Sequence, residues 1–209
     1  MKPLGILGGT FDPIHYGHLR PAQEIFRALD LAEIRFIPAA NPPHRRTPVA
    51  TAEQRSRMVA LAVVGIPGFV VDKREIDRGG LSYTVETLES LRQEWGSRSL
   101  CLMMGTDAFE GIGSWHQADR LPTLANIIVM TRPGWNISGS EALPSWAQDR
   151  IERDQKKLNQ HISGKIVFQA VTPQPISATQ VRKAIAHGEP VENFMPAAVL
   201  EYIRTNRIY

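Results

Sequence analysis

Short apolar runs alternate with amphipathic helical patterns along most of this 209-residue chain, and no other feature constrains its fold as much. The first run, residues 4–7, precedes apolar residues at helical spacing from Leu19 to Leu29. Further strand-like runs occur at 34–37, 69–71, 100–104, 127–130 and 165–171, and further helical patterns at 51–62, 82–91, 178–186 and 196–205. Such alternation predicts an α/β fold with a doubly wound parallel sheet, helices on both faces and a C-terminal helical segment.

Composition limits the class of protein further. With 43% apolar residues the chain is long enough for one substantial core, so we expect a single domain over residues 1–209, with a C-terminal helical subregion at about 177–209. Its only cysteine, Cys101, lies in an apolar run, which excludes an internal disulfide framework. A signal peptide and a run of the ~20 apolar residues that span a bilayer are both missing. We therefore expect a soluble cytoplasmic protein that binds no membrane.

The segment from Gly8 to His18, GGTFDPIHYGH, lies where the first strand should end and the first helix begin. Its glycines allow close approach of the backbone to a ligand, and Thr10 adds a hydroxyl group. His15 and His18 flank the predicted helix N-terminus, whose free N–H groups attract anions. These groups together predict a polyphosphate site. Either histidine alone would be explained by capping or packing, and a zinc site is disfavoured because no third ligand has suitable spacing.

Four other polar segments also follow predicted strands. They are Asn41–Arg46, Gly105–Asp107, Arg132 and Ile176–Arg182. Because ligands bind beyond the carboxyl ends of parallel strands, all of them should meet the first segment at one rim of the sheet. An active site on this architecture is assembled from several such loops, so the shared location predicts one.

The motifs resemble the nucleotidyltransferase superfamily that carries an HxGH signature, here residues 15–18, and a later SxTxxR element, here residues 177–182. Within it the chain is similar to the bacterial nicotinate-mononucleotide adenylyltransferases. The wider match comprises GGTFDPIHYGH, NPPHR at 41–45, SYT at 82–84, GTD at 105–107, Trp115, RPG at 132–134 and ISATQVR at 176–182. The family often has lysine where this chain has Arg45, followed here by Arg46, so which arginine contacts phosphate stays open.

This resemblance implies a Rossmann-like fold and transfer of the adenylyl group of ATP to nicotinate mononucleotide, giving nicotinate adenine dinucleotide and pyrophosphate in NAD biosynthesis. The attacking phosphate oxygen is already ionised at neutral pH, so the site needs no strong base and no covalent intermediate. It needs cations, N–H groups and magnesium, which the ATP phosphates and water would mainly hold. Substrates would be ATP and nicotinate mononucleotide, with no nucleic acid and no protein metal site.

The resemblance also assigns residues to the ATP side. Catalytic roles fall to His15, His18 and Arg182, with His18 best placed to stabilise the transition state. ATP binding is assigned to Gly8, Gly9, Thr10, Phe11, His15, His18, Gly105, Asp107, Arg132, Ser177, Thr179 and Arg182. Ordinary alternatives exist for several of them: Ser177 and Asp107 are also frequent helix caps, and Arg132 also suits a surface turn.

Residues on the acceptor side depend more on the resemblance. Nicotinate mononucleotide binding is assigned to Asn41, His44, Arg45, Arg46, Tyr83, Thr84 and Trp115. Two prolines stiffen the loop before the basic residues, which would hold the mononucleotide phosphate, although a solvated basic turn explains them equally well. Trp115 would stack on the pyridine ring, or else belongs to the core.

The motifs are also compatible with rival functions. A pantetheine-phosphate adenylyltransferase or a cytidylyltransferase would use the same two signatures with another acceptor. A non-catalytic nucleotide-binding regulator on the same fold is the alternative from a different class. An aminoacyl-tRNA synthetase fragment is disfavoured because the chain lacks a KMSKS segment, and a dehydrogenase because the first loop lacks GxGxxG.

Overall fold

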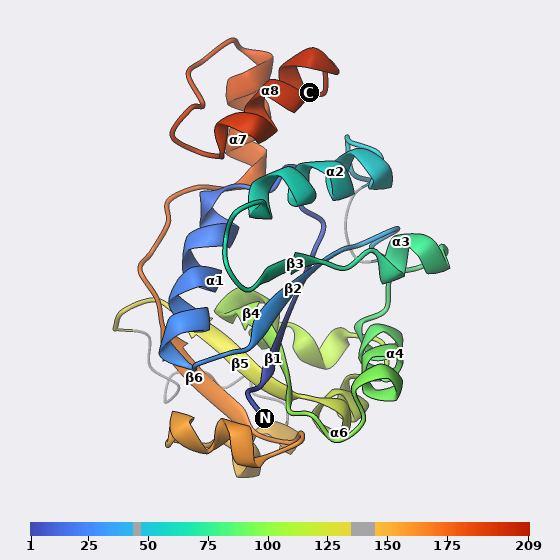
Figure 1. The fold of residues 1–209 in the computed structure, drawn as a ribbon, viewed down its shortest axis with the longest axis vertical. Coiled ribbons are helices and arrows are strands. Elements are labelled where there is room, and N and C mark those ends of the chain that lie inside the picture. The colour runs from blue at the N-terminus through green and yellow to red at the C-terminus, as the bar shows by residue number, and fades with distance from the viewer. Residues whose placement is uncertain (44–46, 135–144) are drawn as a thin grey trace.

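The computed structural model describes residues 1–43, 47–134 and 145–209, except for the side chains of Ser145 and Lys156. In this part of the chain, six parallel strands form one sheet in the order β3-β2-β1-β4-β5-β6 (Figure 1). The strands are β1 (Leu4–Gly9), β2 (Glu33–Pro38), β3 (Phe69–Val71), β4 (Leu100–Gly105), β5 (Asn126–Thr131) and β6 (Ile166–Ala170). This is the expected Rossmann-like topology, whose strand order reverses between β1 and β4.

Helices connect the strands and complete the C-terminal segment. They are α1 (Tyr16–Ala28), α2 (Ala52–Val63), α3 (Arg74–Arg78), α4 (Thr84–Trp95), α5 (Thr106–Glu110), α6 (Leu121–Leu124), α7 (Ala178–Ala186) and α8 (Ala197–Thr205). Short 3-10 helices are η1 (Ile112–Ser114), η2 (Ala118–Arg120), η4 (Ser145–Arg150) and η5 (Gln155–Gln160). The last two lie in the polar segment between β5 and β6. None of the helices found in the described residues is long and apolar enough to cross a membrane.

Side chains of every strand except β3 alternate between two buried clusters. On β4, Cys101 and Met103 join the cluster that contains α1, α2, α7 and α8, whereas Leu100 and Leu102 join the cluster that contains α4, α5 and α6. A parallel sheet covered on both faces needs this two-residue alternation with apolar residues on each side. Figure 1 shows α1 and α4 on opposite sides of the sheet. The prediction of helices on both faces is therefore confirmed.

Local sequence determines where two helices begin. Thr51 caps α2 by accepting a hydrogen bond from the Gln54 N–H at 3.2 Å, and the Gln54 side chain accepts one from the Thr51 N–H at 2.9 Å. Ser177 and Gln180 form the same reciprocal pair at the start of α7. The second pair matters for the site, because it fixes the orientation of the first turn of α7.

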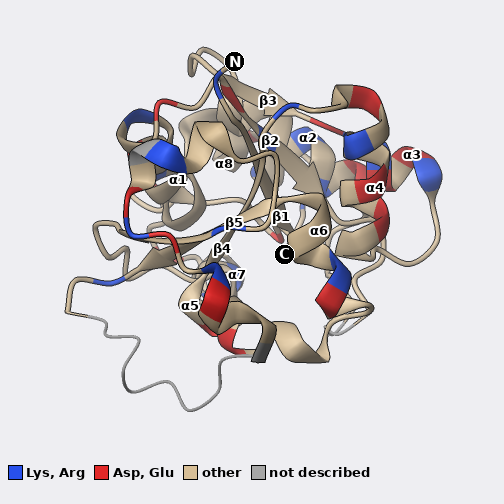
Figure 2. Ribbon diagram, turned by 90° about the horizontal axis from the view of Figure 1, so that it is seen from below, with Lys and Arg blue, Asp and Glu red and all other residues tan. Residues whose placement is uncertain are grey.

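Charged residues of both signs lie side by side over α3 and α4 (Figure 2). Arg74 contacts Glu94 at 2.6 Å and Arg78 contacts Glu86 at 3.5 Å, so cations and carboxylates on these helices offset one another. Arg74 also reaches Asp72 at the end of β3, with 2.7 Å between Nη2 and a carboxylate oxygen. Through Arg74, these ion pairs connect the end of β3 to α4. They help to fix the position of α4 relative to the sheet.

Candidate functional site

The first loop, residues 8–18, leaves the sheet at Gly9 and enters α1 at Tyr16. Gly8 is exposed, and a Cβ atom there would meet nothing within 4 Å, so its backbone is open to a ligand. A Cβ on Gly9 would instead lie 2.9 Å from the ring of Phe11, which is buried. The two glycines therefore serve different purposes: one exposes backbone, and the other makes room for an aromatic ring.

His15 and His18 stack at the N-terminus of α1, with 3.9 Å between ring centroids. The backbone N–H of His15 donates to Nδ1 of His18 at 3.3 Å. Because Nδ1 accepts this bond, a neutral His18 ring carries its proton on Nε2. His15 itself is only 4% exposed, and burial lowers its pKa to about 4, so the ring is neutral at physiological pH.

Gly17, between the two histidines, lies where there is no room for a side chain. A Cβ at this position would lie 2.7 Å from Nδ1 of His15 and 3.1 Å from the carbonyl oxygen of Ile176. Any larger residue would push the His15 ring away or separate the loop from the segment before α7. Glycine between the histidines is thus a packing requirement, and it also shows that two segments distant in sequence lie against each other.

The segment from Ser177 to Arg182 joins the first loop through its arginine. Nη1 of Arg182 donates to the backbone oxygen of Asp12 at 2.7 Å, across 170 positions of sequence. Nη2 donates to the Thr179 hydroxyl at 3.3 Å. The Ser177 hydroxyl accepts from the Gln180 N–H at 3.2 Å, so the capping role that the sequence offered as an alternative for Ser177 is present. Residues 8–18 and 177–182 together are called the His18 cluster below.

A second group of predicted residues forms around Ser82. Its hydroxyl accepts from the N–H groups of Ala40 at 2.8 Å and Asn41 at 3.3 Å, and its own N–H donates to the Asn41 oxygen at 3.0 Å. This places Asn41 beside the start of α4, where Thr84 is the first helical residue. The Ser82 hydroxyl and N–H therefore hold the backbone of the second loop beside the start of α4.

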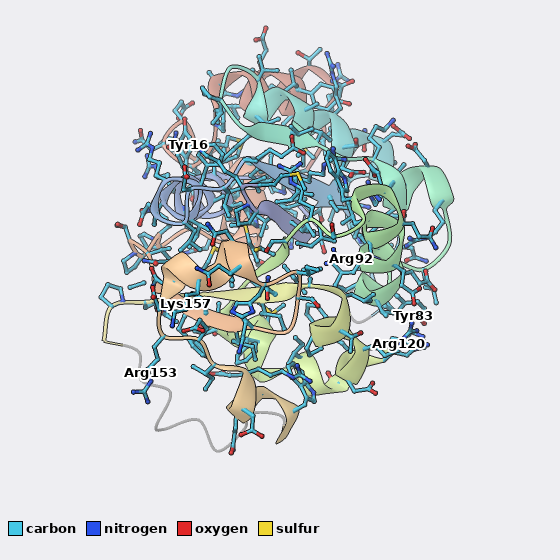
Figure 3. The ribbon with its side chains drawn as sticks, turned by 60° about the horizontal axis from the view of Figure 1, so that its bottom comes forward. Tyr16, Tyr83, Arg92, Arg120, Arg153 and Lys157 are labelled. Atoms are coloured by element: carbon cyan, nitrogen blue, oxygen red, sulfur yellow. The ribbon has the colours of Figure 1, made fainter. Side chains whose placement is uncertain are left out.

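The second group also contains aromatic rings. The Tyr83 ring stacks on His116 with 4.3 Å between centroids, and Tyr83 and Trp115 pack against the same buried cluster. Arg120 pairs with Glu89 of α4, and Figure 3 draws Arg120 and Tyr83 on the same side of the molecule. Residues 40–41, 82–84 and 115–116 are called the Ser82 cluster below. His44, Arg45 and Arg46, expected here, lie outside the described residues.

Gly105, Asp107 and Arg132 lie at the ends of the central strands. β4 and β5 pair up to Gly105 opposite Met130, so the exposed Arg132 and the exposed Asp107 leave neighbouring strands at the same edge. A Cβ on Gly105 would meet nothing within 4 Å. The strand pairing places these three residues at the same rim as the His18 cluster.

Three polar residues at this rim received no role from the sequence: the buried Arg55 and Asp12, and the half-buried Tyr209. The Arg55 guanidinium donates to the backbone oxygens of Thr10 at 2.8 Å and Ala40 at 3.0 Å. The Asp12 carboxylate accepts from backbone N–H groups and from the hydroxyl of Tyr209 at 2.6 Å. One sequence signal was available for Arg55, which stands on the same face of α2 as the buried Met58 and Val59.

Comparisons with known proteins agree over nearly the full chain. A family model described as cytidylyltransferase-like matches residues 6–184. A protein of Halorhodospira halophila named "probable nicotinate-nucleotide adenylyltransferase" is 45% identical over 97% of this chain and 93% of its own length. A protein of Methylococcus capsulatus with the same name is 44% identical over 99% of both chains.

Solved structures show the same architecture. The Plasmodium falciparum nicotinic acid mononucleotide adenylyltransferase complexed with NaAD matches with a TM-score of 0.74, covering 100% of this chain and 98% of that one. Its sequence is only 16% identical, so this likeness shows the fold. A structure from Vibrio parahaemolyticus, titled a putative nicotinate-nucleotide adenylyltransferase, matches with a TM-score of 0.65 at 13% identity.

Proposed function

The chain belongs to the cytidylyltransferase-like family, and on this premise we propose that it is a nicotinate-nucleotide adenylyltransferase. It transfers the adenylyl group of ATP to the phosphate of nicotinate mononucleotide and releases pyrophosphate. The observation that carries this proposal is the agreement over nearly the full chain with relatives of that name, at 45% and 44% identity. It distinguishes the proposal from a pantetheine-phosphate adenylyltransferase, which would share only the two signatures.

Positioning and charge stabilisation account for the reaction. The attacking phosphate oxygen is ionised at neutral pH, so no residue must remove a proton from it. As pyrophosphate leaves, negative charge grows on its oxygens, and a preorganised N–H donor stabilises that charge. Nε2 of His18 is such a donor, because the backbone N–H of His15 occupies its other nitrogen. The neutral, buried His15 ring packs against the His18 ring, with 3.9 Å between their centroids.

The His18 cluster forms the ATP side in this proposal. The exposed Gly8 backbone approaches the phosphates, with Gly9, Thr10 and Phe11 shaping the loop around it. Arg182 and Thr179 bind the terminal phosphates from α7, and Ser177 contributes through the helix N-terminus that it caps. Residues Gly105, Asp107 and Arg132 complete the ATP side from the neighbouring strands.

Nicotinate mononucleotide binds at the Ser82 cluster in this proposal. Asn41 and the basic residues His44, Arg45 and Arg46 hold its phosphate. The aromatic pair Tyr83 and Trp115 faces the pyridine ring, and Thr84 with the start of α4 faces its carboxylate. Support comes from the hydrogen bonds of Ser82, which bring the second loop and α4 together.

Magnesium is proposed to arrive with ATP. Among the described residues, no group of three or more histidine, cysteine or acidic side chains could hold a metal ion. The exposed Asp107 carboxylate and the Thr10 hydroxyl are oxygen donors of the kind magnesium prefers, so the rim fits an ion carried by the phosphates. The chemistry such an ion supplies when bound is neutralisation of charge on the leaving pyrophosphate. A cytoplasmic location and the lack of nucleic-acid partners stay predictions.

The test is a direct assay of acceptor choice. Purified protein is mixed with ATP, magnesium and one acceptor at a time: nicotinate mononucleotide, its nicotinamide counterpart, or pantetheine phosphate. Pyrophosphate release and the mass of the product are measured. We expect nicotinate adenine dinucleotide with the first acceptor and a much lower rate with the other two. Activity with pantetheine phosphate alone would overturn the proposal.

A further inference from the structure

Asp12 is a buried carboxylate whose partners come from distant parts of the chain. Its Oδ2 accepts from the Val49 N–H at 2.9 Å, and its Oδ1 accepts from the Ala50 N–H at 3.1 Å. The Tyr209 hydroxyl donates to Oδ1 at 2.6 Å, across 197 positions. Only 6% of Asp12 is exposed, so its charge depends on these donors rather than on water.

The same residue also holds Arg182. Its backbone oxygen accepts from Nη1 of Arg182 at 2.7 Å, while that nitrogen lies 3.7 Å from the carboxylate oxygen Oδ2. The guanidinium thus stands close to two acceptors of one residue and bonds the neutral one. In this arrangement Arg182 remains partly exposed, with 28% of its side chain accessible, and can receive a phosphate.

The Tyr209 hydroxyl stabilises the Asp12 carboxylate, so that Arg182 need not pair with it. Without this hydroxyl, Oδ1 of the buried carboxylate would lose its shortest hydrogen bond, and the guanidinium of Arg182 lies 3.7 Å from Oδ2 of the same carboxylate. The carboxylate would then draw the guanidinium toward itself and away from the rim. Burial, and then the neighbouring Asp12 carboxylate, raise the pKa of the Tyr209 phenol, so the hydroxyl keeps its proton throughout the neutral range.

We propose that Tyr209 is a positioning residue for ATP binding, which acts through Asp12 to keep Arg182 directed at the phosphates. The inference rests on the proposed function, because it assigns Arg182 to ATP. It goes beyond that function by giving a role to a residue that follows α8 and lies outside every motif. Because the Tyr209 hydroxyl bonds the Asp12 carboxylate, its effect on ATP binding is expected to pass through Arg182.

The test is a double-mutant cycle. Tyr209→Phe should lower kcat/KM for ATP roughly tenfold, the size expected for a lost hydrogen bond to a buried charge, and should leave KM for nicotinate mononucleotide within about twofold. In an Arg182→Ala background, the same change should alter kcat/KM for ATP by less than about twofold. Tyr202→Phe is the matched control, because it removes a hydroxyl from a half-buried tyrosine of α8 in the same core.

Two results would overturn the inference. An unchanged kcat/KM for ATP in Tyr209→Phe would remove its role, and equal losses in both backgrounds would show a structural effect that does not pass through Arg182. Thermal unfolding of each variant is measured alongside. The affinity for ATP without acceptor, measured by titration calorimetry, keeps this test separate from the proposed function: it should weaken in Tyr209→Phe whichever acceptor the protein uses.

Discussion

The two clusters at the rim are built in different ways. In the His18 cluster, His15, Phe11 and Asp12 are almost fully buried, and contacts join segments 170 positions apart. In the Ser82 cluster, Asn41 is exposed, and Tyr83 and Trp115 are half-buried. Its segments are joined mainly by hydrogen bonds that the hydroxyl and the N–H of Ser82 form with the backbone of residues 40 and 41. Close packing suits the part that must stabilise a transition state without moving. A looser layer suits the part that decides which acceptor enters.

The largest expected effect is on kcat, when the His18 side chain is removed from the first cluster. His18→Ala should lower kcat by about a hundredfold to a thousandfold, the usual loss for a donor that acts on transition-state charge, while ATP affinity changes little. Steady-state kinetics and titration calorimetry measure the two quantities. His187→Ala, at the exposed end of α7, is the control and should leave both unchanged. Turnover near the normal value in His18→Ala would remove this residue from the catalytic group.

The next prediction tests the burial of His15. In the folded chain its pKa is about 4, against an unfolded value near 6.5, so only the unfolded chain binds a proton between these pH values. Stability should therefore fall as pH drops from 6.5 toward 4, by as much as about 3 kcal/mol from this residue. Free energies of unfolding in urea are compared at pH 7 and pH 4.5 for the natural chain and for His15→Gln. Equal pH dependence in both proteins would contradict a buried neutral histidine.

How far the sequence predicts these features depends on the range of the interaction. Strands and long helices follow from local periodicity, so α7 begins and ends where predicted. The short helices α3, α5 and α6 span too few residues to show a period, and they were missed. Motifs indicated that residues 8–18 and 177–182 share the rim, because the topology of parallel strands dictates it. The link between Asp12 and Tyr209 spans 197 positions and depends on packing, which no local pattern reports.

The smallest expected effect is on the KM for one substrate alone, and it tests whether the two clusters act independently. Ser82→Ala leaves the N–H groups of Ala40 and Asn41 without their shared acceptor, so the second loop should loosen against α4. KM for nicotinate mononucleotide should rise about fivefold to tenfold, while KM for ATP and the thermal unfolding temperature stay close to normal. Ser90→Ala is the matched control, because that hydroxyl also lies on the α4 side but accepts from Arg74, away from the second loop. If Ser82→Ala raises both KM values alike, the two clusters are mechanically one unit, and the acceptor cannot be exchanged without disturbing the ATP side.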